Sequence, residues 1–149
     1  MQKENKKLLL SGLGLGLIVA IYQIRRIKQI DIKIKNADII KLSFKQISVN
    51  LNLAINNTSN LTATIADYSY IVKFNGKSIL ENSAIINQEI APAQKTVIPI
   101  KIDFKPINLI KSIGKGLMNK NMVLDVDINV NAKILHFNWP FKINYKLKV

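Results

Sequence analysis

The stretch Ser48-Val49-Asn50-Leu51-Asn52-Leu53-Ala54-Ile55-Asn56 decides the fold class of this chain. Its large apolar side chains stand at every second position, and small or polar residues stand between them. Successive side chains of a β-strand point to opposite faces, so this alternation predicts a strand with one buried face. The polar cluster at 56–60 that follows it predicts a turn.

The same period of two returns along the rest of the chain. It begins again at Tyr68 and is broken at Asn75-Gly76, a dipeptide that is typical of a tight β-hairpin. A further strand is predicted over 97–104, where Pro99 favours a sheet edge or a strand start because proline cannot donate a ladder hydrogen bond. Two long, half-exposed strands are predicted over 122–131 and 141–149.

Composition limits the architecture to one domain with an appended segment. The chain has 149 residues, of which 48% are hydrophobic, and it contains no cysteine. Disulfides, thiolate metal sites and a cysteine nucleophile are therefore excluded. The net charge of +13 indicates an anionic neighbour, such as lipid headgroups or nucleic acid.

One short segment departs from the β pattern. Between Pro106 and Met118, apolar residues recur at spacings of three and four, which predicts one short helix packed on the sheets. Pro106 suits the first turn of a helix. The segment before the main alternation, residues 27–40, carries alternating isoleucines and is expected to form a juxtamembrane strand or stalk.

The N-terminal region, residues 1–26, is predicted to be a single-pass transmembrane anchor. Residues 8–24, LLLSGLGLGLIVAIYQI, form a run of 17 without a charge. At about 1.5 Å per residue a helix of this length covers roughly 25 Å, close to the thickness of the hydrocarbon core. The apolar residues assigned to the anchor are Leu8, Leu9, Leu10, Leu13, Leu15, Leu17, Ile18, Val19 and Ile21.

Two other interpretations of residues 8–24 are less favoured. A secretory signal peptide is disfavoured because no small-residue cleavage site follows Val19 and Ala20. A buried helix of the globular domain is disfavoured because charges gather at both ends of the run and none interrupts it. Gly12 and Gly16 have the GxxxG spacing that allows close helix packing, so self-association through the anchor is a candidate, beside simple tolerance of glycine in lipid.

The order of these features resembles the late-embryogenesis-abundant (LEA) type 2 domain, also called the water-stress and hypersensitive-response domain. The resemblance rests on the 56–60 turn, on Tyr70–Lys77, on Ile90-Ala91-Pro92-Ala93 before the 97–104 strand, and on Asn138-Trp139-Pro140-Phe141. Asn57 and Thr58 stand where the family usually has a proline. The resemblance implies an all-β, immunoglobulin- or fibronectin-III-like sandwich of about seven strands over residues 41–149, with one helix and no catalytic site.

No motif for catalysis or metal binding is present, so no enzyme activity and no cofactor are predicted. His136 is the one histidine, and it has no second histidine or cysteine to complete a metal site. Asp125, Asp127 and Asn129 imitate the start of a calcium loop, but Val130 and His136 occupy the positions that require glycine and glutamate. The aspartates are therefore interpreted as the wet face of a strand.

Two groups of basic residues are candidates for contact with an anionic surface. Arg25, Arg26 and Lys28 follow the uncharged run at 8–24, and Lys142, Lys146 and Lys148 share one face of the last predicted strand. Each could bind lipid phosphate or nucleic acid. The alternative is a solvated strand face in a lysine-rich chain. Stacking on bases is not supported, because Phe141 and Tyr145 alternate onto the opposite side.

These observations favour a non-enzymatic, membrane-anchored structural or binding module that presents a β-sandwich at a membrane surface. The alternative is a structural component of a larger membrane-associated assembly, such as the virion of a membrane-containing phage, with protein partners. A tethered binder of an apolar ligand comes next, and a nucleic-acid binder is the least favoured hypothesis. The expected location is a cell membrane or the internal membrane of a virion.

Overall fold

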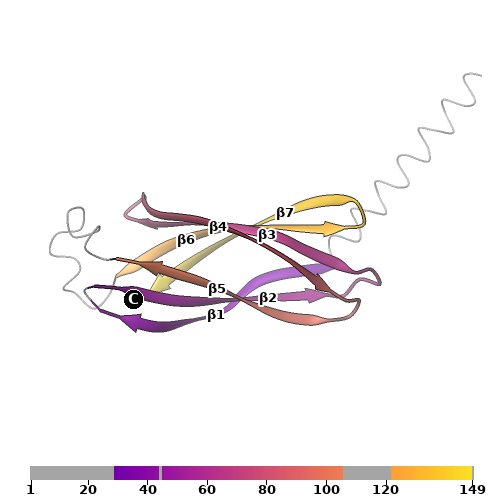
Figure 1. Cartoon of the computed structure of the whole chain (residues 1–149), viewed down its shortest axis with the longest axis horizontal. Coiled ribbons are helices and arrows are strands. Elements are labelled where there is room, and N and C mark those ends of the chain that lie inside the picture. The colour runs from indigo at the N-terminus through magenta and orange to yellow at the C-terminus, as the bar shows by residue number, and fades with distance from the viewer. Residues whose placement is uncertain (1–28, 44, 106–121, 149) are drawn as a thin grey trace, which may run out of the picture.

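The computed structural model describes residues 29–43, 45–105 and 122–148, and these form a two-layered β-sandwich (Figure 1). The described part contains seven strands: β1 (Ile30–Leu42), β2 (Ile47–Asn57), β3 (Ala63–Phe74), β4 (Lys77–Ile90), β5 (Lys95–Phe104), β6 (Val123–Ile134) and β7 (Phe137–Lys148). The prediction of an all-β sandwich of about seven strands is confirmed. The helix expected over 106–118 and the anchor expected over 1–26 lie outside the described residues.

The strands form two antiparallel sheets. One sheet has three strands in the order β1-β2-β5, and the other has four in the order β4-β3-β6-β7. Each sheet turns one face toward the other, as in aligned β-sandwiches, whose cores are filled by the inward side chains of both layers.

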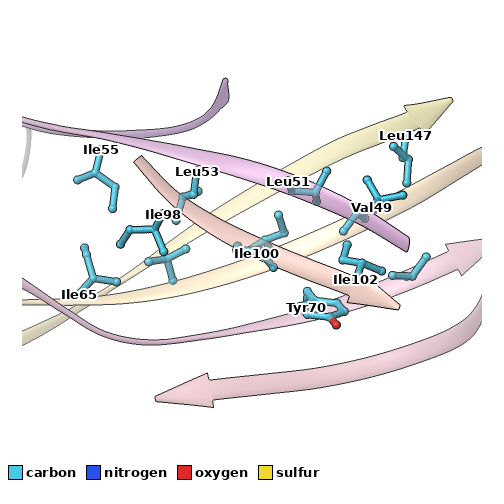
Figure 2. Close-up of a cluster of buried hydrophobic side chains, with 14 of the residues drawn as sticks. Val49, Leu51, Leu53, Ile55, Ile65, Tyr70, Ile98, Ile100, Ile102 and Leu147 are labelled. Carbon is cyan, nitrogen blue, oxygen red and sulfur yellow. The ribbon is translucent and has the colours of Figure 1, made fainter. Parts of the chain in front are cut away.

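Strand β2 is the centre of the smaller sheet, and it shows why the alternation decides the fold. Its apolar side chains Val49, Leu51, Leu53 and Ile55 are 0% to 1% exposed, whereas the asparagines between them point to the outer face. Figure 2 shows these side chains beside Ile98, Ile100 and Ile102 of β5 in the same sheet, in one core with Ile65, Tyr70 and Leu147 of the opposite sheet. A strand between two neighbours in one layer must bury one face against the other layer, which the period of two provides.

The expectation for Pro99 agrees with the topology. β5 pairs only with β2 within its sheet and is therefore an edge strand, with Pro99 opposite Asn52. Proline at an edge removes no hydrogen bond from a central ladder.

The sandwich includes β1, so it begins earlier than the expected boundary at residue 41. β1 is paired with β2 along its whole length, from Ile30 opposite Asn57 to Leu42 opposite Ile47. Ile30 is buried, and Ile32 and Ile34 pack against the core. Ile30, Ile32 and Ile34 thus cover one edge of the core, and of the two forms expected for residues 27–40 the described part, from Ile30 on, is a strand.

The Asn75-Gly76 hairpin forms between β3 and β4 as predicted. Both residues have positive φ, 49° and 76° respectively. Asparagine and glycine are the residues that adopt this backbone at least cost, which explains why this dipeptide marks the turn.

Candidate functional site

The outer face of β7 carries the lysines singled out in the sequence. Lys142, Lys146 and Lys148 are exposed and alternate with the inward residues Phe141, Ile143, Tyr145 and Leu147. β7 is an edge strand of the four-stranded sheet, so these ammonium groups lie on its outer face beside a strand edge that has no partner among the described strands. A row of lysines on an exposed strand face is suited to contact with a broad anionic surface.

The neighbouring strand supplies acidic and amide groups to the same outer face. In the β6–β7 register, Lys146 stands opposite Asp125, and Lys142 stands opposite Asn129. The face is therefore mixed in charge near β6 and basic at the β7 edge. Phe141 and Tyr145 point to the inner side and pack against the core, as the alternation in the sequence predicted.

A polar ladder crosses the outer face at Asp127. The Lys73 ammonium donates to Oδ2 of Asp127 over 2.7 Å, and the Asn144 amide donates to Oδ1 over 2.6 Å. The hydrogen bond from Lys73, followed by that from Asn144, lowers the pKa of Asp127 below its usual value. The bond to Asp127 in turn raises the pKa of Lys73. The ladder joins β3, β6 and β7 through one carboxylate.

The same contacts support the interpretation of the aspartates as a solvated strand face. Asp125, Asp127 and Asn129 lie in the extended strand β6, half-buried on its outer side. Asp127 is already engaged by Lys73 and Asn144. Within the described residues, no group of three or more histidine, cysteine or acidic side chains is placed to hold a metal ion.

The most buried polar cluster surrounds Asn57, and sequence reasoning did not single out its side chain. Asn57 is 0% exposed, and its Nδ2 donates to the carbonyl oxygens of Leu61 (2.8 Å), Ile90 (3.0 Å) and Ala91 (3.1 Å). Its Oδ1 accepts hydrogen bonds from the backbone N–H and hydroxyl of Ser59. These bonds fix the turn after β2 to the end of β4 in the other sheet. The available signal was the asparagine-rich turn itself, 56–60, whose partners are distant in the sequence.

The β6–β7 connection is a tight turn that the sequence pattern does not mark. Leu135 and His136 are its two central residues. Leu135 has a φ of 58° and is 56% exposed, and Phe137 is 47% exposed. The chain reverses here without glycine, asparagine or proline in the turn, so the sequence carries no ordinary turn signal at this point.

The residues assigned to the membrane anchor, the Gly12 and Gly16 pair, and Arg25, Arg26 and Lys28 all lie outside the described residues. Among the residues that the structure does describe, no helix has the length and apolar character needed to cross a membrane. Their assignment stays a prediction from the sequence.

Comparison with known proteins shows which solved structures share this fold. No protein-family model matches the chain, and no curated protein matches it either. Solved structures do match. The solution structure of a late embryogenesis abundant (LEA) protein has a TM-score of 0.59 at 12% identity, covering 99% of this chain and 86% of the other. The sandwich therefore has a LEA-like fold.

Two further solved structures agree. A crystal structure of a protein from Archaeoglobus fulgidus has a TM-score of 0.58 at 13% identity and covers 80% of this chain and 95% of its own. An X-ray structure of a structural genomics target has a TM-score of 0.61 at 10% identity, and the match covers 82% of this chain and 88% of the other. The descriptions of these three proteins name no reaction. At identities this low, the similarity shows a shared fold alone.

Proposed function

We propose that this chain is a non-enzymatic, membrane-anchored module that presents its LEA-like sandwich at a membrane surface. The observation that carries the proposal is the run of 17 uncharged residues over 8–24, which ends six residues before β1 begins at Ile30. A segment of this length and composition favours insertion into a bilayer. The short connection would hold the sandwich close to the lipid surface.

The polar groups of the sandwich support a binding or structural role. Asp127 and Asn57 are engaged in bonds that join strands or sheets. The exposed lysines of β7 form a row of positive charge on one strand face, which is suited to association with an extended anionic or acidic partner.

Alkaline carbonate extraction of membranes that contain the full chain tests the anchor. The unaltered chain should stay in the membrane pellet. Replacing both Leu15 and Leu17 with aspartate should release it, because each aspartate near the centre of a span costs about 2.5 to 3.5 kcal/mol of insertion free energy. Replacing the same two residues with isoleucine is the matched control and should leave the chain in the pellet. Release of the unaltered chain would overturn the proposal.

A structural role in a larger membrane-associated assembly is the second candidate, and the observation in its favour is the exposed row Lys142, Lys146 and Lys148 at a sheet edge. Amine-reactive crosslinking in the native membrane or particle, followed by mass spectrometry, tests it. Reproducible links from these lysines to a few abundant proteins would support an assembly. Links confined to the chain itself would favour a freestanding module at the lipid surface.

A further inference from the structure

The turn between β6 and β7 exposes two large apolar side chains at the tip of a hairpin. Leu135 is 56% exposed and Phe137 is 47% exposed, and only His136 separates them. A single exposed apolar side chain is common on protein surfaces. Two at the tip of one hairpin form a small exposed apolar patch, which water solvates poorly.

The backbone of Leu135 adds a second, independent observation. Its φ of 58° lies in the left-handed region, where a branched aliphatic residue is strained. The other tight hairpin of the molecule, at Asn75-Gly76, meets the same requirement with residues that suit it. Folding alone would therefore favour asparagine or glycine at position 135, so the leucine is better explained by a contact outside the fold.

The strand register places this tip at a definite end of the sandwich. Ile134 pairs with both Phe137 of β7 and Ala63 of β3, and Ala63 pairs with Ile90. The Ile90 carbonyl accepts a hydrogen bond from Asn57, which pairs with Ile30 at the start of β1. The hairpin tip and the beginning of β1 therefore lie at the same end, as Figure 1 shows, and the Asn75-Gly76 hairpin lies at the opposite end.

The chain outside the described residues joins the sandwich at this end. The Gln29 carbonyl accepts hydrogen bonds from the backbone N–H and the hydroxyl of Thr58, which fixes the point of entry. The 28 residues before it include the uncharged run at 8–24, which is followed by the basic residues Arg25, Arg26 and Lys28. A bilayer that holds that run would lie against the end of the sandwich where Leu135 and Phe137 are exposed.

We propose that the tip of the β6–β7 hairpin, Leu135 to Phe137, inserts into the interfacial layer of the bilayer and forms a second lipid contact beside the anchor. This inference rests on the proposed membrane anchoring. Leucine and phenylalanine are side chains that lie at the boundary between headgroups and acyl chains, and flanking cations strengthen such contacts with anionic lipid. Lys133, exposed on β6, supplies one such charge, and Glu89 lies across β3 from it on the same face. The tip would fix the tilt of the sandwich at the surface.

Single-cysteine labelling of the full chain tests the proposal, because the chain has no native cysteine. His136→Cys places an environment-sensitive fluorophore at the tip, and Lys77→Cys places the same fluorophore at the opposite end, where β4 begins. Both variants are reconstituted into vesicles of phosphatidylcholine and phosphatidylglycerol that also contain lipid with a nitroxide in the headgroup region. Vesicle flotation reports anchoring, and quenching of each label reports its contact with lipid.

The expected result is flotation of both variants, with emission lost at residue 136 and retained at residue 77. Adding Leu135→Asn and Phe137→Thr to the His136→Cys chain should restore emission while flotation is unchanged, and circular dichroism should show that the sandwich is intact. Flotation with no quenching at residue 136 would overturn the hairpin contact and leave the anchor standing. Failure to float would overturn the proposed function and this inference together.

Discussion

The amide of Asn57 donates to the carbonyl oxygen of Ile90 over 3.0 Å and so joins the last residue of β2 to the last residue of β4 in the opposite sheet. The same Nδ2 also reaches the carbonyls of Leu61 and Ala91. One buried side chain of the three-stranded sheet thereby bonds the end of β4 in the other sheet and the two connections beside it. A buried carbonyl without a hydrogen-bond partner costs free energy. The side chain of Asn57 therefore stabilises the contact between the two sheets.

Replacing Asn57 with alanine should lower the free energy of unfolding by about 2 to 4 kcal/mol, since the buried hydrogen bonds to the Ile90 carbonyl and from the Ser59 N–H and hydroxyl would be lost. Equilibrium unfolding in urea measures the change. Asn56→Ala is the matched control, because Asn56 is the neighbouring asparagine on the outer face of β2 and is half-buried. Equal losses of unfolding free energy in the two variants would contradict a stabilising contact of Asn57 between the sheets.

The strand β2 could be predicted from the sequence because the alternation of a strand with one buried face is contained in its own residues. The positions of Lys142, Lys146 and Lys148 on one face follow from the same local rule. The network of Asn57 could not be predicted, because its partners Ile90 and Ala91 are 33 and 34 residues away and meet it only when the two sheets pack.

The β6–β7 turn was missed for a different reason. Ile134, Leu135 and Phe137 form an apolar run interrupted by one histidine, and none of them is a residue that ordinarily marks a turn. Only the backbone shows that the chain reverses at Leu135. The exposure of Leu135 and Phe137 could not be predicted for the same reason, because a pattern of apolar residues assigns leucine and phenylalanine to the core.

A reciprocal exchange of turn residues tests the strain at the tip. Leu135→Asn should raise the free energy of unfolding by about 1 kcal/mol, because asparagine adopts positive φ more readily than leucine. Asn75→Leu should lower it by a similar amount, because it creates the same strain in the β3–β4 hairpin, where φ is 49°. Thermal unfolding of both variants in detergent measures the two shifts. A loss of stability in Leu135→Asn would show that the leucine contributes to packing.

The Lys73–Asp127 pair should give stability a pH dependence at both extremes. The pKa of Asp127 is lowered in the fold by its hydrogen bonds from Lys73 and Asn144, so its contribution is fully present above the carboxylate's unfolded value and is lost as pH falls through the lowered pKa. The pKa of Lys73 is raised chiefly by its hydrogen bond to Asp127, so its contribution is fully present below the unfolded value and is lost as pH rises through the raised pKa.

Asp127→Asn should therefore flatten the stability profile below about pH 4 and above about pH 10, the ordinary ranges of the two groups. The effect at neutral pH should be much smaller than that of Asn57→Ala, because both side chains of the pair are more than one third exposed and water screens their attraction. Urea unfolding across pH measures the profile. Asp125→Asn, two residues away on the same face of β6, is the control and should keep more of the slope at both ends.

Pro99 protects a free sheet edge. Among the described strands, β5 has β2 as a neighbour on one side and none on the other, so an outward backbone N–H in this strand could pair with a second molecule. Proline has no N–H to offer, and its ring blocks the continuation of a ladder. Pro99→Thr should therefore increase concentration-dependent self-association with little change in the free energy of unfolding, since residue 99 faces outward and is exposed. Light scattering over a dilution series measures association, with the exposed outer-face substitution Val97→Thr on the same strand as the control. Association that is equal in the two variants would show that the side chains, and not the missing donor, govern this edge.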